Sequence, residues 1–397
     1  MKNIIITGGG MQNKGAQSMT FICISQLKKM YPNDRIILVT LANEKADKYN
    51  FDIIKISYPA LKCVIKPINK LKMLINRIKK SDINQIETIY KNSRMMVDVS
   101  GYALGSNWAD ATVDYYLTCI ECAKKFNVPV YIMPQSFGPF DYPKDSYMMK
   151  RIKETMTYPK VIYTREKEGQ ELLKSKFQLN NLTSSCDLVL KSKSANRESV
   201  YKDTNKECVM TIFDNAVAVI PNVRTFDQKN KDIVVGYYRT IIDWLLEKKH
   251  AVYLIHHSAE DKSFCEELKK CYPNETFLFN INEELDCFDY EEIIKRFDYV
   301  IASRYHSIIH ALKNSIPCIA LGWAIKYKEL LSLVGQKDCV LDVRDELTKR
   351  ELYEVLNLME NEYVKRGKLI QDYVKILQQE DIFNDIFKME KEIDAKR

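Results

Sequence analysis

The sequence predicts an α/β fold made of two parallel-sheet units that face each other, with helices closing the chain. Three observations lead to this prediction. Short β-branched runs alternate with longer segments of helical periodicity, which is typical of βαβ units. A polar stretch interrupts this alternation once, near the middle of the chain. The length of 397 residues is more than one hydrophobic core usually supports, so two domains are expected.

Apolar runs define the predicted strands of each unit. Those of the first unit are 3–7, 35–40, 51–56, 95–100, 128–133 and 160–164. The polar stretch "KSKSANRESVYKDTNKE" (191–207) contains the predicted linker. The strands of the second unit are 216–221, 250–255, 276–280, 298–303 and 316–321. We therefore predict an N-terminal domain over 1–195, a linker over 196–207, a C-terminal domain over 208–345 and closing helices over 346–397.

Composition narrows the class of protein. The chain is 46% hydrophobic and 28% charged, and its apolar runs are far shorter than the roughly 20 residues of a membrane span. Lys2 and a strand pattern follow Met1 at once, so we expect no signal peptide and a cytoplasmic protein. Eleven scattered cysteines then favour reduced thiols over disulfides. The net charge of +7 is mild and suggests anionic ligands rather than nucleic acid.

A glycine-rich loop, "TGGGMQNKGAQSM" (7–19), joins the first strand to the first helix, where backbone can approach an anion closely. It is not a dinucleotide fingerprint, because Asn13 stands where the third glycine belongs. It is not a P-loop either: Gly10 and Gly15 are correctly spaced, but Ala16 and Gln17 replace the Lys and Ser/Thr. A ligand loop and a tight turn without a ligand both remain open.

Two further loops are expected at carboxyl ends of strands, where open parallel sheets bind ligands. The loop "PQSFGPF" (134–140) presents Gln135 and Ser136 as hydrogen-bonding groups. The loop "PNVRTF" (221–226) places Arg224 just past a strand, although an isolated loop arginine is more often a surface residue.

The segment "IASRYHSIIHALKNSIPCIALGWAIK" (301–326) carries the strongest signal. A helix starting near Tyr305 directs its free N–H groups and positive dipole end at whatever lies beyond Ser303. Arg304 adds a fork suited to phosphate or carboxylate, and His306 adds a proton that can move near neutral pH. The junction predicts a site for an anionic substrate that undergoes proton transfer.

The same helix offers a second interpretation, in which His306 and His310 bind a metal from positions i and i+4. Ser307 stands where a metalloprotease needs Glu, and no third ligand is evident, so we expect no metal. His310 is expected to pack inside the protein.

These motifs together resemble the polysaccharide pyruvyl transferase family. The C-terminal signature is "SRYHSIIHALKNSIPCIALGWAIKYKELLSLVG", that is Ser-Arg-x-His, an apolar helix, a Pro-initiated strand and then a Lys. The "NKG" loop, the "PQSFGPF" loop and "TREKEGQELL" (164 onward) resemble the family's other landmarks in order, over roughly residues 4 to 335. Two positions depart: Ala16 replaces an Asp of many members, and "CDLVL" keeps Asp187 but lacks the Pro and aromatic that usually follow.

The resemblance implies two Rossmann-type domains of the glycosyltransferase GT-B kind. It implies transfer of pyruvate from phosphoenolpyruvate, a co-substrate, to two hydroxyls of a cell-surface glycan or its lipid-linked precursor as a ketal, with no cofactor. On this basis His306 is the expected general acid/base and Arg304 its catalytic partner. The expected donor ligands are Arg304, Lys326, Arg224 and Ser303. The expected acceptor ligands are Asn13, Gln135 and Ser136.

Two other functions remain open at this stage. One is glycosyl transfer from a nucleotide sugar, because Arg and Lys serve a diphosphate equally well and the fold is shared. The other is a non-catalytic protein that binds a sugar or an anion, which the Ala16 departure makes conceivable. The sequence does not indicate an oligomeric state.

One basic segment, "KCVIKPINKLKMLINRIKK" (62–80), has seven basic residues and no acidic one, with apolar residues at helical spacing. A basic amphipathic helix can lie on an anionic membrane, here at the inner face, which would suit a lipid-linked acceptor. The alternative, which we favour from sequence, is an ordinary helix packed on the sheet with a solvated basic face.

Overall fold

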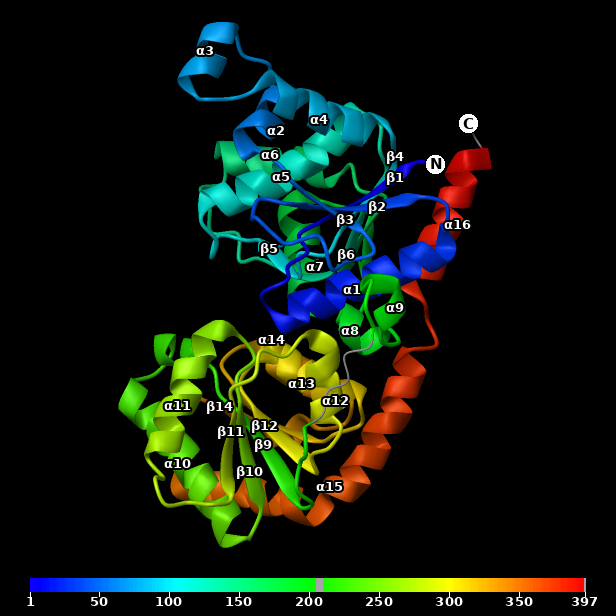
Figure 1. Cartoon of the computed structure of the whole chain (residues 1–397). Helices are drawn as coiled ribbons and strands as arrows, with labels where there is room; N and C mark the ends of the chain where they lie inside the picture. The colour runs from blue at the N-terminus through cyan, green and yellow to red at the C-terminus, as the bar shows by residue number, and fades with distance from the viewer. Residues whose placement is uncertain (205–209, 396–397) are drawn as a thin grey trace.

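The N-terminal half folds around a parallel sheet in the order β3-β2-β1-β4-β6-β7-β8, with β5 paired to β6 (Figure 1). The computed structural model describes residues 1–204 and 210–395. The strands are β1 (Asn3–Thr7), β2 (Arg35–Thr40), β3 (Asp52–Lys55), β4 (Ser93–Asp98), β5 (Tyr102–Leu104), β6 (Val130–Phe137), β7 (Val161–Thr164) and β8 (Leu182–Ser184). The helices are α1 (Lys14–Met30), α2 (Tyr58–Ile65), α3 (Lys70–Ile75), α4 (Lys80–Lys91), α5 (Asp110–Lys125), α6 (Tyr147–Met156), α7 (Lys167–Phe177), α8 (Leu188–Lys191) and α9 (Arg197–Val200).

The second half repeats this plan with a parallel sheet in the order β11-β10-β9-β12-β13-β14. Its strands are β9 (Ala216–Ile220), β10 (Ala251–Ile255), β11 (Leu278–Ile281), β12 (Tyr299–Ala302), β13 (Cys318–Gly322) and β14 (Val340–Asp342). Its α-helices are α10 (Lys231–Glu247), α11 (Lys262–Lys270), α12 (Cys287–Ile294), α13 (Tyr305–Lys313) and α14 (Ile325–Ser332). Short 3-10 turns cover Val223–Asp227, Ala259–Asp261 and Lys337–Cys339. The predicted pair of α/β units is confirmed.

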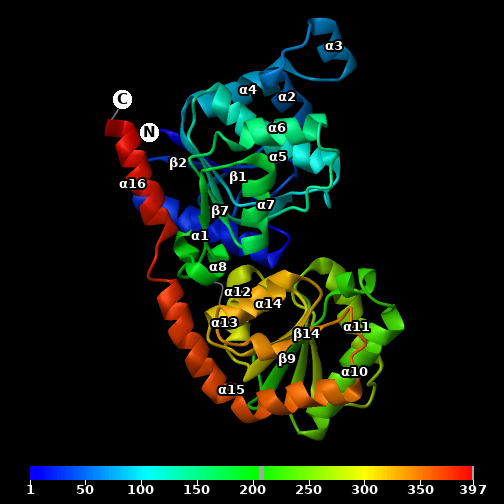
Figure 2. The ribbon, with the colours of Figure 1, turned by 180° about the vertical axis from the view of Figure 1, so that it is seen from behind.

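Strand order reverses at the first strand of each sheet, since β1 lies between β2 and β4, and β9 lies between β10 and β12. The register is parallel throughout: Ile4 pairs with Ile36 on one side and with Met95 on the other. Loops on the two sides of such a reversal run in opposite directions and leave room for a ligand at the carboxyl ends of the strands. Both sheets turn these ends toward the other domain (Figures 1 and 2).

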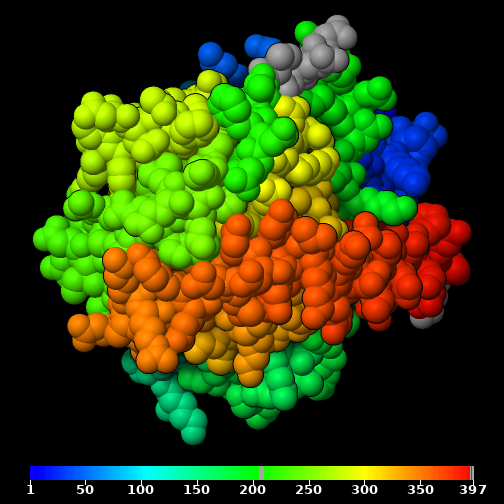
Figure 3. Space-filling view, turned by 90° about the horizontal axis from the view of Figure 1, so that it is seen from below, coloured from blue at the N-terminus to red at the C-terminus, as the bar shows by residue number. Residues whose placement is uncertain are grey.

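Two C-terminal helices close the chain, as predicted. The long helix α15 (Lys349–Leu377) begins with a capping box between Thr348 and Glu351. It forms a continuous band across the second domain and leads into α16 (Ile382–Ala395) (Figure 3). The second helix, α16, returns to the first domain, where the Tyr131 hydroxyl donates a 2.6 Å hydrogen bond to Glu390. The chain therefore crosses between the domains twice.

The two domains share one core. A single buried apolar cluster contains residues of both sheets, and Phe21 of α1 stacks on Phe288 of α12 with ring centroids 5.7 Å apart. The cysteines within the described residues are free, and all but Cys271 are buried. None of the helices in the described part of the chain is both long and apolar enough to cross a membrane.

Two local predictions were wrong. The "PQSFGPF" segment is not all loop: β6 runs through Phe137, because β5 and β7 both pair with it there. Residues 62–80 do not form one amphipathic helix. Pro67 has no N–H to donate and Lys66 before it is extended, so α2 ends at Ile65 and α3 starts again at Lys70.

Candidate functional site between the domains

The start of α13 lies against the start of α1, so His306 sits where the two domains meet. Gly15 makes this approach possible: a Cβ atom at Gly15 would lie 2.1 Å from Cγ of His306, far inside van der Waals contact. The helix begins at Tyr305, as predicted, with Arg304 as its N-cap residue. The imidazole is 17% exposed. The glycine of the "NKG" loop therefore serves the packing of the histidine from the other domain.

His306 faces a buried ion pair of the first domain. Its Nε2 atom lies 3.6 Å from Oδ2 of Asp187, and the same oxygen accepts a 2.7 Å hydrogen bond from Arg165. The other oxygen of Asp187 caps α8 by accepting from the N–H of Val189. Arg165 also donates to Ser136 Oγ at 2.6 Å. The carboxylate thus lies between a guanidinium, from which it accepts a hydrogen bond, and an imidazole, which it approaches without one.

Beside the Asp187–His306 pair, the side chains of Arg165 and Lys326 both lie against the ring of Tyr305. The guanidinium of Arg165 lies 5.1 Å from the ring centroid of Tyr305, and Nζ of Lys326 lies 5.2 Å from the same centroid. Arg165 Nε and His306 Nε2 are buried without a hydrogen-bond partner, with carboxylate oxygens of Glu166 and Asp187 at 3.7 and 3.6 Å. Lys326 forms no ion pair with any described residue. Buried polar groups are normally paired, so these open positions indicate a place for an anionic ligand.

The surroundings set the protonation states. Burial, together with the cations Arg165 and Lys326, lowers the pKa of His306 to about 4, although Asp187 opposes the shift. Burial and the nearby Arg165 lower the pKa of Lys326 to about 8. Burial raises the pKa of Asp187, but the neighbouring His306 and Arg165 outweigh it and leave that pKa lowered. At neutral pH the free site holds a neutral imidazole beside a carboxylate.

The structure places the other predicted donor ligands apart from this cluster. Arg304 forms a bidentate pair with Asp261, at 2.8 and 2.6 Å, and also contacts Glu260. Arg224 is 59% exposed and pairs with the same Glu260. Ser303 is fully buried and bonds the Tyr238 hydroxyl. Arg304 and Arg224 are therefore already neutralised by carboxylates.

Of the three predicted acceptor ligands, only Ser136 contacts this cluster. Asn13 caps α1 and reaches across to Ser258 of the second domain at 3.4 Å. Ser136 joins the site, since its hydroxyl donates to Glu166 at 2.9 Å and accepts from Arg165. Gln135 does not: it has no exposed surface and donates to Asp98 inside the first domain. Neighbouring residues of a strand point to opposite faces, so Ser136 contacts the site whereas Gln135 points into the first domain.

A sequence model described as "Polysaccharide pyruvyl transferase" matches residues 13–324 of the chain, a range that contains Arg165, Asp187 and His306 and ends two residues before Lys326. The chain belongs to this family. No curated protein sequence matches it significantly.

Solved structures similar to this pyruvyl transferase family member share its fold at low identity. A UDP-GlcNAc 2-epimerase from Methanocaldococcus jannaschii matches with a TM-score of 0.58 and 15% identity, over 96% of this chain and 100% of that one. A glycosyltransferase from Rickettsia africae matches with a TM-score of 0.56 and 13% identity, over 99% of this chain and 97% of that one. A putative UDP-N-acetylglucosamine 2-epimerase from Listeria monocytogenes matches with a TM-score of 0.59 and 12% identity, over 93% of this chain and 90% of that one. The predicted GT-B-like fold of this family member is confirmed.

Sequence reasoning did not assign roles to several residues at this interface. Arg165 and His257 each lie at the carboxyl end of a predicted strand, which is the signal that selected Arg224. Lys14 of α1 is buried and donates to the backbone carbonyl of His257 at 3.0 Å. The ring of His257 stacks near that of His306, with centroids 6.4 Å apart. Applying the strand-end rule to every strand would have found Arg165 and His257.

The metal interpretation of His306 and His310 finds no further ligand. His310 is buried, with Nε2 3.1 Å from Ser18 Oγ and Nδ1 3.9 Å from Glu291. Over residues 1–204 and 210–395 there is no group of three or more His, Cys, Asp or Glu side chains that could hold a metal ion. The expectation of no metal stays a prediction, which the chelator experiment below tests.

The buried histidines should make this family member acid-sensitive. Burial lowers the pKa of His310 to about 4, from 6.5. Between these values the unfolded chain binds a proton that the folded protein does not, so stability falls as pH drops from 6.5 toward 4. The wild type should lose about 2 kcal/mol more free energy of unfolding than His310→Gln between pH 7.5 and 4.5, as measured by urea unfolding. If the wild type and the variant lose the same amount, His310 is not the source of the acid sensitivity.

Proposed function

We propose that this protein transfers a pyruvyl group from phosphoenolpyruvate to two hydroxyls of a sugar in a cell-surface polysaccharide or its lipid-linked precursor. The family match supports a transferase acting in polysaccharide synthesis. The observation that supports this donor is the group of polar atoms without a hydrogen-bond partner around Tyr305: Arg165 Nε, His306 Nε2 and the Lys326 ammonium. A small molecule with a carboxylate and a phosphate fits such a set, because each anionic group needs a cationic partner.

The chemistry requires two proton movements. In the proposed reaction the methylene carbon C3 of the donor takes a proton, and C2 becomes electrophilic. One sugar hydroxyl attacks C2, the bond from C2 to the phosphate oxygen breaks, and the second hydroxyl closes the ketal. Of the two hydroxyl protons released, one replaces the proton given to C3 and the other leaves on inorganic phosphate. A single group that gives and takes a proton suffices for this sequence.

We assign that role to His306, which faces Asp187. The neutral ring of the free protein gains a proton when an anionic donor lies beside it, since nearby negative charge favours the imidazolium. Lys326 and Arg165 hold the carboxylate and phosphate and stabilise the leaving group. Arg304, paired with Asp261, fixes the start of α13 and so the position of the ring.

The acceptor side is proposed to lie at the glycine-rich loop. A cavity of about 260 Å³ opens there at the carboxyl ends of β1 and β2, lined among others by Gly10, Gln12, Asn13, Thr40 and Glu44. These polar groups suit sugar hydroxyls. Ala16 also lines the cavity, so the residue that departs from many family members lies against the proposed acceptor.

Ligand-induced stabilisation tests the donor. Phosphoenolpyruvate at a hundred times its Kd should stabilise the protein by about 2.7 kcal/mol, whereas UDP-sugars should not. A response to UDP-sugars alone would instead support the nucleotide-sugar glycosyltransferase suggested by the fold. Stabilisation by phosphoenolpyruvate without phosphate release, across a broad set of glycan acceptors, would indicate a binding protein.

Removal of divalent metals gives a second prediction. We expect phosphate release from phosphoenolpyruvate to persist at full rate in excess chelator, because side chains meet the charges of the donor. The measurement is release of inorganic phosphate before and after dialysis against the chelator. Loss of the activity, followed by recovery with magnesium, would overturn the metal-free scheme.

A further inference from the structure

The α2–α3–α4 hairpin, which we define as residues 58–91, carries a surface that the proposed reaction does not use. Its middle helix α3 projects from the first domain at the end farthest from the second domain (Figures 1 and 2). None of the residues of α3 is buried. Leu71, Leu74 and Ile75 are 66%, 76% and 70% exposed. Three large aliphatic side chains on one six-residue helix thus face solvent.

Basic residues flank this apolar group on both sides in the sequence. The exposed basic residues of the hairpin between 62 and 80 are Lys62, Lys66, Lys70, Lys72, Arg77, Lys79 and Lys80. Among the residues that the structure describes, only Lys62 of these seven forms an ion pair, with Asp114. The segment contains no acidic residue. The positive charge is therefore not neutralised within the described protein and complements an anionic surface.

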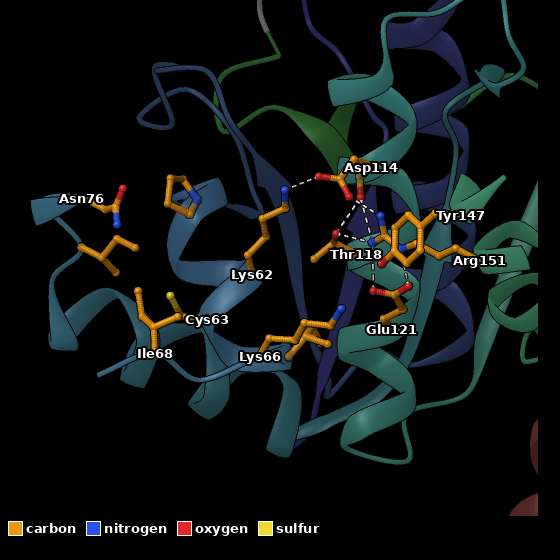
Figure 4. Close-up of a pocket in the computed structure, with 13 residues that line it drawn as sticks. Lys62, Cys63, Lys66, Ile68, Asn76, Asp114, Thr118, Glu121, Tyr147 and Arg151 are labelled. Carbon is orange, nitrogen blue, oxygen red and sulfur yellow. Dashed lines mark hydrogen bonds and ion pairs between the residues drawn. The ribbon is translucent and has the colours of Figure 1, made fainter. Parts of the chain in front are cut away.

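Helices α2 and α4 of the hairpin pack into the first domain through residues such as Leu61 and Tyr90, whereas α3 has no buried residue. A cavity of about 510 Å³ lies between the hairpin and helices α5 and α6, and Ile68 and Ile78 face this space (Figure 4). The far wall is an ion-pair network in which Arg151 contacts Asp114 and Glu121. Those carboxylates are paired, whereas Lys66, which also lines the cavity, forms no ion pair within the described residues. The exposed aliphatic side chains lie on α3, and basic residues without an ion pair flank them on both sides in the sequence.

The shape of α3 is set locally. Asn69 caps it by accepting from the N–H of Lys72, and the N–H of Ile78 donates to the carbonyl of Met73 at 2.9 Å. Arg77 has a φ of 53°, which turns the chain back just after the six-residue helix. These bonds keep the aliphatic tip exposed without help from the rest of the domain.

We propose that α3 docks this protein on an anionic membrane surface, with Leu71, Leu74 and Ile75 entering the headgroup region and the flanking lysines contacting lipid phosphates. The observations that favour a membrane over a protein partner are the single sign of the charge and the small, convex apolar tip. The surface lies away from the interface between the domains, so docking tethers the protein and does not cover the candidate site. This inference does not depend on pyruvyl transfer.

Vesicle sedimentation of the full chain tests the proposal. We expect binding to phosphatidylcholine vesicles that contain roughly 30% phosphatidylglycerol, and little binding to phosphatidylcholine alone. Raising the salt from about 0.1 M to about 0.5 M should weaken it, because lysine contacts to lipid phosphates are screened. A variant with Leu71, Leu74 and Ile75 changed to Ser should bind at least about tenfold more weakly.

Two matched variants separate apolar from charge contributions. Changing Ile233, Val364 and Ile376 to Ser removes three exposed aliphatic side chains from α10 and α15, and should leave vesicle binding unchanged. Changing Lys70, Lys72 and Lys79 to Gln should reduce binding about tenfold and remove most of the salt dependence. All three variants should melt near the wild type, since the altered side chains are exposed.

Other outcomes overturn the proposal. Equal binding to neutral and anionic vesicles would refute the role of the lysines. Absence of vesicle binding would refute docking. If the wild type instead forms a dimer in sedimentation velocity that the Leu71, Leu74 and Ile75 variant cannot form, a second copy of the chain covers α3.

Discussion

His306→Asn should lower phosphate release from phosphoenolpyruvate by about a hundred- to ten-thousandfold while leaving the fold intact, the usual range for loss of a positioned acid/base. Asparagine is close in size and polar, but it cannot carry a proton between the donor carbon and a sugar hydroxyl. The free imidazole is neutral at pH 7, so the variant loses little charge that attracts the donor. We expect the dissociation constant of phosphoenolpyruvate to change less than about tenfold, so that binding and turnover separate.

His310→Gln is the matched control for this experiment. His310 lies one turn further along the same helix and is also buried, but it contacts Ser18 and Glu291 and not the cations around Tyr305. Its turnover should stay within a few-fold of the wild type. The pH profile of His306→Asn should also lose one limb. If His306→Asn melts several degrees lower yet turns over normally per folded molecule, the histidine serves packing alone.

Arg165→Met should abolish the stabilising effect of phosphoenolpyruvate and also lower the free energy of unfolding by about 3 to 5 kcal/mol. The substitution keeps much of the volume but removes the charge that pairs with Asp187 and approaches Glu166. A buried carboxylate left without its partner is strongly destabilising, whereas loss of the pair as a whole is not. The measurements are urea unfolding and the melting temperature with and without phosphoenolpyruvate.

A double variant keeps this test decisive if Arg165→Met folds poorly. Combining it with Asp187→Asn removes the unpaired charge, so most of the lost stability should return, but the response to phosphoenolpyruvate should not. Arg165→Lys should retain part of the response, since a lysine keeps the charge but not the two-sided contact to Asp187 and Ser136. A double variant that still responds fully to phosphoenolpyruvate would remove Arg165 from the donor site.

Residue type and position in the sequence were not enough to predict whether Arg304 or Arg165 lies in the candidate site. Arg165 directly follows β7, and Arg304 lies two residues past the end of β12. The sequence favoured Arg304 because it stands at a helix start, two residues before His306. In the folded chain Arg304 meets Asp261, which lies 43 residues away in sequence, and becomes neutralised. Arg165 meets His306 through Asp187. Both arginines pair with carboxylates, and Arg165 differs in that its Nε is buried without a hydrogen-bond partner.

In the hairpin of residues 58–91, the sequence likewise did not predict which aliphatic side chains are exposed. Helical spacing of Leu71, Leu74 and Ile75 is compatible with packing on a sheet and with exposure, and sequence alone favoured packing. Pro67 ends the preceding helix, and the segment then folds back on itself, so these side chains have no sheet to cover. Their exposure is a consequence of chain path and not of residue type.

The sequence by itself determined the two α/β units, the helix start at Tyr305, the closing helices and the family, because short-range periodicity and contiguous motifs encode them. Only the tertiary structure decided which side chains share the site. Gly15, Asp187 and Arg165 come from separated segments of the first domain and reach the site through domain packing, whereas Lys326 joins it from within the second domain. Such long-range contacts are set by the burial of a core shared between the domains, and no local pattern of residues records them.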